Sequence, residues 1–179
     1  VAGSDQWGNC IAGVDLLRRV AAGEAHIWTA PLIVNKSTGV KFGKSEGGAV
    51  WLDSAKTTPT AFYQFWINCD DLGAEDYLKI YTLLGREEIE AIMAKQRENP
   101  GARYAQTRLA EEVTRLVHGE EALVTAQRVT ACLVGDAPVG EADENTLAAL
   151  RAEIPTVQTS ETGSLLDALV SSGLSDSKG

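Results

Sequence analysis

Apolar residues recur at helical spacing through most of the chain after residue 57. Thr58 followed by Pro59 is typical of a helix N-cap and its first turn. Because residues three, four and seven positions apart share one face of a helix, this spacing predicts a series of helices. The third, fourth and fifth are expected at 86–98, 103–118 and 120–134, and shorter ones at 143–151 and 163–171. The expected apolar faces are Phe62, Phe65, Trp66 and Cys69 in the first, Tyr77, Ile80, Tyr81 and Leu84 in the second, and Leu109, Val113, Leu116 and Val117 in the fourth.

The first 55 residues follow a mixed pattern. Residues 10–22 have an apolar face at helical spacing, with Asn9 as a good N-cap and Gly23 just beyond the end. A short apolar run at 31–35 indicates a buried strand, and residues 49–52 indicate another.

The chain is therefore predicted to be mostly helical overall and to have three parts. A small α/β part is expected at about 1–55, an all-α helical domain at about 56–135, and an acidic connection at 136–179. The formal net charge of −9 by itself argues against nucleic-acid binding. However, residues 1–45 have five basic and three acidic side chains, whereas 136–179 have two and eight.

Three scattered cysteines, Cys10, Cys69 and Cys132, argue against a disulfide framework and against a zinc site. We interpret them as small buried thiols in a reducing cytoplasm. The two histidines have no metal-like companions nearby, so no metal site is expected. No apolar run is long enough to span a membrane, and no membrane partner is expected. Because the chain starts at Val1 without a methionine, we expect a fragment of a longer protein.

The segment GVKFGKSEGG at 39–48 combines glycines with Lys41, Lys44 and Ser45. It is not a P-loop, because that motif has four residues between its first glycine and Gly-Lys-Ser, and here only three intervene. Two ammonium groups could meet the negative charge that builds on a pyrophosphate leaving group, and the glycines would let the loop close. The alternative is a solvated turn with two surface lysines.

The string GSDQWGN at 3–9 directly precedes the first expected helix. Helix N-termini favour anions and hydrogen-bond acceptors, and Gly3 would let a ligand approach the backbone closely. Asp5 can accept two hydrogen bonds from a ribose diol, and Gln6 offers one donor group and one acceptor. The alternative is that Ser4 and Asp5 merely cap the helix.

Two further patterns have structural interpretations. The aromatic run FYQFW at 62–66 could stack on bases, but its helical spacing favours core packing. The pairs Arg108–Glu112 and Glu111–Arg115 are spaced four residues apart, as ion pairs on a helix surface are.

GSDQWGN, then KFGKS at 41–45, then a helical domain together resemble the bacterial type of tyrosyl-tRNA synthetase. KFGKS is similar to the KMSKS signature of class I aminoacyl-tRNA synthetases, with Phe42 in place of Met and Gly43 in place of Ser. AFYQFWINCDD at 61–71 and LAEEVTRLVHGEEAL at 109–123 also resemble that family, so the resemblance covers essentially the whole chain. GSDQWGN is the specific string, because the related tryptophan enzymes share the loop signature but not this one.

The resemblance implies that 1–55 is the C-terminal part of a Rossmann-like catalytic domain and that 56–135 is the anticodon-side domain that docks tRNA(Tyr). It implies tyrosine and ATP as substrates, ATP with Mg²⁺, and no bound cofactor. The segment 136–179 would end at the start of a small basic RNA-binding domain.

By the same resemblance, Gly3 and Asp5 would contact the adenylate ribose, and Gln6 would lie by the amino and carboxylate end of tyrosine. Lys41 and Lys44 would be catalytic, because they would bind the departing pyrophosphate. The ATP loop also includes Phe42 and Ser45.

The resemblance places the family's HIGH motif, the tyrosine-hydroxyl pocket and most of a homodimer interface upstream of Val1. We therefore expect the isolated chain to be inactive. One alternative is a non-catalytic RNA-binding or scaffold protein that retains a synthetase fold, against which the intact Asp5, Gln6, Lys41 and Lys44 argue. The other is an unrelated nucleotide-binding protein with a chance lysine loop, against which the helical domain argues.

Overall fold

The computed structural model describes residues 1–36, 39, 50–158 and 163–175. The chain forms two compact units, Val1–Ala49 and Val50–Gly179, which are described separately below. The mostly helical fold predicted from the sequence is confirmed. The expected division into parts at 1–55, 56–135 and 136–179 stays a prediction.

The first unit contains one parallel strand pair connected through a helix. Strand β1 (Ala2–Gly3) leads through the short 3₁₀ turn η1 (Ser4–Gln6) into helix α1 (Trp7–Ala21), and the chain returns to strand β2 (Thr29–Ala30). Ala2 pairs with Thr29 and Gly3 with Ala30 in parallel register. Parallel strands need such a crossover connection, so this part of the chain is a βαβ unit. The sequence pattern predicted its helix and a strand after it, but it did not identify β1.

The bounds predicted in this unit are partly wrong. The helix begins at Trp7 and not at residue 10, so Asn9 lies in its first turn and Gln6 occupies the N-cap position. The strand lies at Thr29–Ala30, just before the predicted 31–35, where only Val34 forms an isolated bridge. A strand is limited by its partner, and β1 offers only two residues for pairing.

The second predicted strand, 49–52, is also wrong for its described residues, Val50–Leu52. The backbone N–H of Trp51 donates to Oγ1 of Thr57 at 3.0 Å, in a local turn. The ammonium of Lys56 lies 4.3 Å from the centre of the Trp51 ring. These two local contacts turn the segment back on itself, and strand pairing is absent from it.

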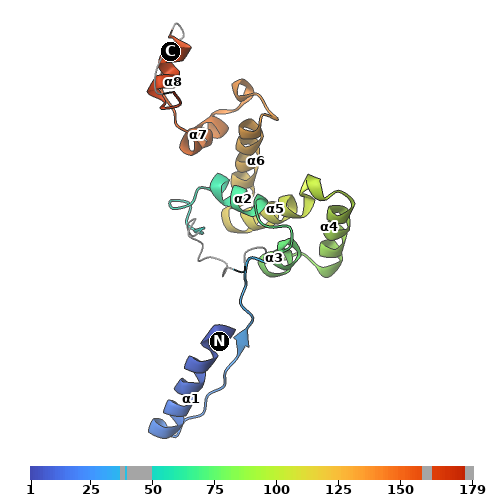
Figure 1. The fold of residues 1–179 in the computed structure, drawn as a ribbon, viewed down its shortest axis with the longest axis vertical. Helices are drawn as coiled ribbons and strands as arrows, with labels where there is room; N and C mark the ends of the chain where they lie inside the picture. The colour runs from blue at the N-terminus through green and yellow to red at the C-terminus, as the bar shows by residue number, and fades with distance from the viewer. Residues whose placement is uncertain (37–38, 40–49, 159–162, 176–179) are drawn as a thin grey trace. The chain divides into compact units, whose positions relative to one another are not determined.

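The second unit is built from helices (Figure 1). Thr58 caps the first of them as predicted, since its Oγ1 accepts from the N–H of Ala61 at 3.1 Å. The helices α4 and α6 have the predicted bounds. The elements in chain order are α2 (Pro59–Ile67), α3 (Ala74–Tyr81), α4 (Arg86–Glu98), η2 (Pro100–Ala102), α5 (Tyr104–His118), α6 (Glu120–Val134), η3 (Val139–Glu141), α7 (Glu144–Glu153) and α8 (Leu165–Ser171).

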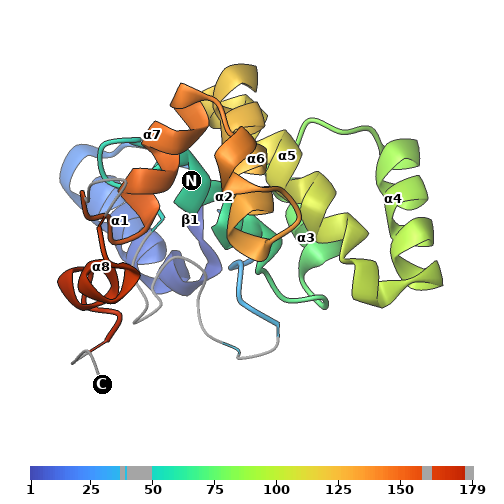
Figure 2. The same cartoon turned by 90° about the horizontal axis from the view of Figure 1, so that it is seen from above.

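The core of this unit lies where α2 packs against α5 and α6, with α3 and α4 against α5 and with α7 against α6. Figures 1 and 2 both show α2 beside α5 and α6. The aromatic run at 62–66 packs in this core as predicted, with Phe62, Tyr63 and Trp66 at most 5% exposed. Phe62 and Trp66 meet edge to face at 6.2 Å between ring centres.

Two expected core residues are exposed. Ile80 is 52% exposed, and α3 instead buries Ala74 and Leu78 beside Tyr77. Leu116 is 56% exposed in the last turn of α5, although Leu109 and Val113 are buried as predicted. In α3 the buried face is therefore rotated from the predicted one, whereas in α5 the predicted face is right and its last turn is uncovered.

One of the two ion pairs predicted on α5 is confirmed and the other is wrong. Arg108 donates to Glu112 at 2.8 Å and also to Glu111 at 2.7 Å. Arg115 pairs with Glu112 and Glu120, so the predicted Glu111–Arg115 pair is wrong. The carboxylate of Glu111 instead accepts from Arg108 and from Gln127.

Among the described residues, no helix is both long and apolar enough to cross a membrane. The same residues hold no cluster of three or more His, Cys, Asp or Glu side chains arranged for a metal ion. The thiols of Cys10, Cys69 and Cys132 are free. Cys69 is buried as expected, whereas the expected burial is wrong for Cys10 and Cys132, which are only partly buried.

Candidate functional site

The candidate site is the turn from β1 into α1. Gly3 is the last residue of β1 and has an extended backbone, with φ −69° and ψ 156°. Asp5 and Gln6 follow in η1, and α1 begins directly after them. In parallel α/β structures, ligands bind at the carboxyl ends of strands, where helix N-termini also point. The sequence string GSDQWGN is therefore placed at the end of the βαβ unit where a ligand is expected.

Gly3 has no room for a side chain. A Cβ atom on Gly3 would lie 2.7 Å from Oδ1 of Asp5 and 2.8 Å from Cδ2 of Leu32. Both distances are too short for a carbon atom, so both neighbouring side chains would have to move. The carboxylate of Asp5 thus lies directly over the backbone of Gly3, which brings together two of the residues selected from the sequence.

Asp5, Gln6 and Asn9 form a chain of side-chain hydrogen bonds. Nε2 of Gln6 donates to Oδ2 of Asp5 at 3.3 Å, and Nδ2 of Asn9 donates to Oε1 of Gln6 at 2.9 Å. All three side chains are exposed. Gln6 occupies the N-cap of α1 without a side-chain capping bond, so Asp5 does not stand at the cap position. Sequence reasoning missed Asn9 as a partner, because it assigned this residue to the N-cap.

The remaining candidates, Lys41, Phe42, Lys44 and Ser45, lie outside the described residues. The chain leads toward them through Gly39, whose φ of +70° favours glycine. Its backbone N–H donates to the carbonyl of Asn35 at 2.7 Å.

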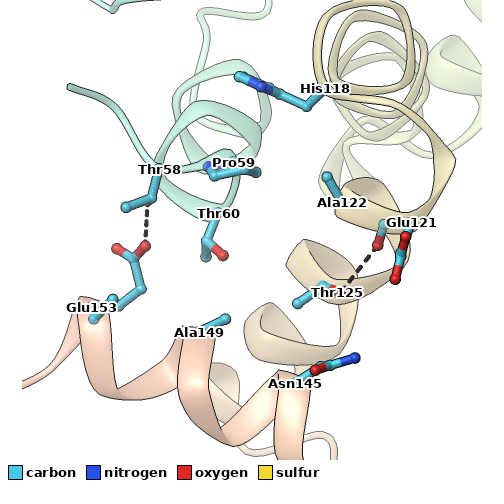
Figure 3. A pocket seen from close by; sticks show the side chains of 11 residues that line it. Thr58, Pro59, Thr60, His118, Glu121, Ala122, Thr125, Asn145, Ala149 and Glu153 are labelled. Carbon is cyan, nitrogen blue, oxygen red and sulfur yellow. Dashed lines mark hydrogen bonds between the residues drawn. The ribbon is translucent and has the colours of Figure 1, made fainter. Parts of the chain in front are cut away.

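A separate pocket of about 460 Å³ lies in the second unit, between the start of α2, the α5–α6 junction and α7. Figure 3 shows the carboxylate of Glu153 pointing to Thr58, whose hydroxyl donates to it. Nε2 of His118 is buried there without a hydrogen-bond partner, and the ring meets Phe62 edge to face at 4.8 Å. Burial lowers the pKa of His118 below its ordinary value. Nothing in the sequence pattern identified this pocket, which is formed by helices far apart in the chain.

The comparison with known families gives one match over most of the chain. Residues 1–135 match the family described as tRNA synthetases class I (W and Y). This range includes the β1–α1 turn, the segment at 41–45 and helices α2 to α6.

Individual relatives agree with this match. The chain is 48% identical over 177 residues to a tyrosine–tRNA ligase of Streptomyces griseus subsp. griseus, and 48% identical over 182 residues to tyrosine–tRNA ligase 2 of Bacillus cereus. These alignments cover 98% and 99% of this chain but 42% and 43% of the relatives. The chain therefore spans less than half the length of the curated relatives it matches.

A solved structure is similar as well. A C-terminally truncated mitochondrial tyrosyl-tRNA synthetase of Aspergillus nidulans aligns with a TM-score of 0.56 and 30% sequence identity. The alignment covers 73% of this chain and 38% of that structure.

Proposed function

Because this chain belongs to the family of class I tRNA synthetases for tryptophan and tyrosine, we propose that it is part of a tyrosine–tRNA ligase. Such an enzyme activates tyrosine with ATP and transfers the tyrosyl group to tRNA(Tyr). The observation that carries the proposal is the 48% identity, over nearly the whole chain, to relatives that are named tyrosine–tRNA ligases. The tryptophan branch is the less favoured one, since GSDQWGN resembles the tyrosine enzymes only.

The proposed reaction has two steps. In the first, a carboxylate oxygen of tyrosine attacks the α-phosphorus of ATP, and the bond to the bridging oxygen of pyrophosphate breaks. In the second, a hydroxyl of the terminal tRNA ribose attacks the carbonyl carbon of tyrosyl-adenylate, loses its proton, and AMP leaves. No protein nucleophile is needed, so positioning and charge stabilisation supply the catalysis.

The β1–α1 turn is proposed to make the contacts with the adenylate ribose and with tyrosine. Gly3 and Asp5 are proposed to bind the ribose of the adenylate, because a carboxylate can accept hydrogen bonds from both hydroxyls of a diol. Gln6 is proposed to contact the amino and carboxylate end of tyrosine. The closeness of Asp5 to the backbone of Gly3 and the bond from Gln6 to Asp5 support this joint role.

The loop at 41–45 is proposed to bind the phosphates. Lys41 and Lys44 would stabilise the charge that develops on pyrophosphate, an effect worth roughly 10²–10³ in rate per donor. Phe42 and Ser45 belong to the same ATP loop. ATP enters as its Mg²⁺ complex, and we expect no resident cofactor.

The helices of the second unit are proposed to form the anticodon-side domain that docks tRNA. The longer ligase is proposed to be a cytoplasmic homodimer. We also propose that the 179 residues alone are inactive, because they span 42–43% of the length of the curated relatives. In addition, none of the described side chains of the first unit is fully buried.

The test is amino-acid-dependent ATP–pyrophosphate exchange by the longer ligase that includes this chain. Exchange with tyrosine and with no other amino acid is expected, and the isolated 179-residue chain serves as the blank. Exchange with tryptophan, or none from a folded protein that still binds RNA, would overturn the proposal. Exchange by the isolated chain would contradict only its proposed inactivity.

A further inference from the structure

The side-chain amide of Gln6 is held at both ends by neighbours within the same turn. Its Oε1 accepts from Nδ2 of Asn9 at 2.9 Å, and its Nε2 donates to Oδ2 of Asp5 at 3.3 Å. An amide has one acceptor end and one donor end, and exchanging them would set Oε1 against the carboxylate of Asp5, which only accepts. Asp5 therefore selects one of two amide orientations, and Asn9 completes it by donating to Oε1.

Asn9 holds the Gln6 amide in that orientation. Its bond to Gln6 is shorter than the Gln6–Asp5 bond by 0.4 Å, taking 2.9 from 3.3 Å. Asn9 lies in the first turn of α1, where its backbone is fixed by the helix, whereas Asp5 and Gln6 lie in η1. The helix thus offers a rigid support from which a second residue can orient the Gln6 amide.

We propose that Asn9 is a positioning residue that fixes the donor end of the Gln6 amide toward Asp5 and the ligand. The inference rests on the proposed function, in which Gln6 contacts the amino and carboxylate end of an α-amino acid. With Oε1 occupied by Asn9, the amide presents Nε2, which donates to a carboxylate oxygen. Asn9 itself touches no substrate.

If Asn9 only stabilised helix α1, Asn9→Asp would have a different outcome from the one that the positioning role predicts. Asn9 is the third residue of α1, and acidic side chains in a first turn stabilise a helix through its macrodipole. Asn9→Asp should therefore leave folding unchanged or improve it. For the amide the same change is unfavourable, because a carboxylate at position 9 only accepts and would draw Nε2 of Gln6 away from Asp5.

The experiment compares Asn9→Asp, Asn9→Ala and the wild type in the longer ligase, by tyrosine-dependent ATP–pyrophosphate exchange and by thermal unfolding. Asn9→Asp is expected to raise the KM for tyrosine by about tenfold or more, the loss typical of a hydrogen bond to a charged group. Asn9→Ala releases the amide without reversing it and is expected to have a smaller effect. Asn145→Asp is the control for thermal stability, because it makes the same charge change as Asn9→Asp in the exposed first turn of α7. Neither Asn9 variant should unfold at a lower temperature than this control.

Three outcomes decide the matter. A larger rise in KM for Asn9→Asp than for Asn9→Ala, at unchanged thermal stability, supports the positioning role. Equal KM values for both variants, or a KM for Asn9→Asp within twofold of the wild type, overturn it. If the wild type itself shows no exchange with tyrosine, the proposed function fails, and that result is distinct from either outcome for Asn9.

Discussion

The hydroxyl of Thr58, at the start of α2, donates a hydrogen bond to the carboxylate of Glu153, the last residue of α7. The same oxygen accepts the backbone N–H of Ala61. One side chain thus caps a helix and connects two segments that are 95 residues apart. The carboxylate also lies where the macrodipole of α2 favours negative charge.

Replacing Thr58 by valine removes both bonds while keeping the shape of the side chain. We expect the free energy of unfolding to fall by about 2 kcal/mol, as the loss of an N-cap and of a second hydrogen bond indicates. Thr58→Ser is the matched control and should stay within about 0.5 kcal/mol of the wild type. Urea unfolding of the 179-residue chain measures both, and equal midpoints for the two variants would contradict the account.

Arg103 closes the other end of α2. Its Nη2 donates to the carbonyls of Ile67 at 2.8 Å and Cys69 at 2.9 Å, while its own backbone has a φ of +51°. Arg103→Ala should lower the free energy of unfolding by about 2 kcal/mol, since hydrogen bonds from a charged donor are lost. Arg103→Gly loses the same bonds but relieves the left-handed conformation, so it should be more stable than Arg103→Ala by about 1 kcal/mol. Chemical unfolding of both variants checks the order, and a more stable Arg103→Ala would contradict it.

His118 should make the stability of the chain depend on pH. Because burial lowers the pKa of His118 in the folded state, the unfolded chain binds the proton first as the pH falls. The contribution of neutral His118 to the free energy of unfolding should therefore be fully present above the ordinary histidine pKa of about 6.5. The free energy of unfolding should decrease as the pH falls below that value.

Thermal unfolding at pH 7.5 and pH 5.5 tests this dependence. His118→Gln should lose less stability between the two pH values than the wild type, because it has no group to protonate at that position. The same substitution at the exposed His26 is the control and should retain the wild-type dependence. An identical pH dependence for the His118 variant and the wild type would show that this residue is not the cause.

The close approach of Asp5 to Gly3 gives a prediction for activity. A Cβ on Gly3 would lie 2.7 Å from Oδ1 of Asp5, so Gly3→Ala must displace the carboxylate that is proposed to bind the ribose. In the longer ligase, we expect the KM for ATP to rise by about tenfold, the effect of one charged hydrogen bond. Gly13→Ala is the matched control, because a Cβ there meets no heavy atom within 4 Å. Similar KM values for both variants would argue against a role for the Gly3–Asp5 contact.

Most helix bounds could be predicted because single residues mark their ends. Gly119 and Gly135 have φ of +87° and +83°, and they flank α6 as the sequence indicates. Such residues encode the end of a helix locally. The apolar spacing likewise identified Phe62 and Trp66 as core, since helical periodicity is a local property that tertiary contacts then use.

The rest depends on partners that are distant in the chain. The two-residue strands could not be placed, because their extent is set by pairing between Ala2–Gly3 and Thr29–Ala30. The candidate site was selected as a string, but its geometry was not foreseen. Asn9 bonds to Gln6 only because α1 begins two residues earlier than Asn9, at Trp7.

The most direct test of the proposed function is tyrosine-dependent ATP–pyrophosphate exchange by the longer ligase with Lys44→Ala. If the segment at 41–45 binds the departing pyrophosphate, the exchange rate should fall by about 10²–10³. Lys56→Ala is the control, since the Lys56 ammonium lies over the Trp51 ring and has no proposed role in the reaction. An exchange rate for Lys44→Ala equal to that of Lys56→Ala would contradict the account.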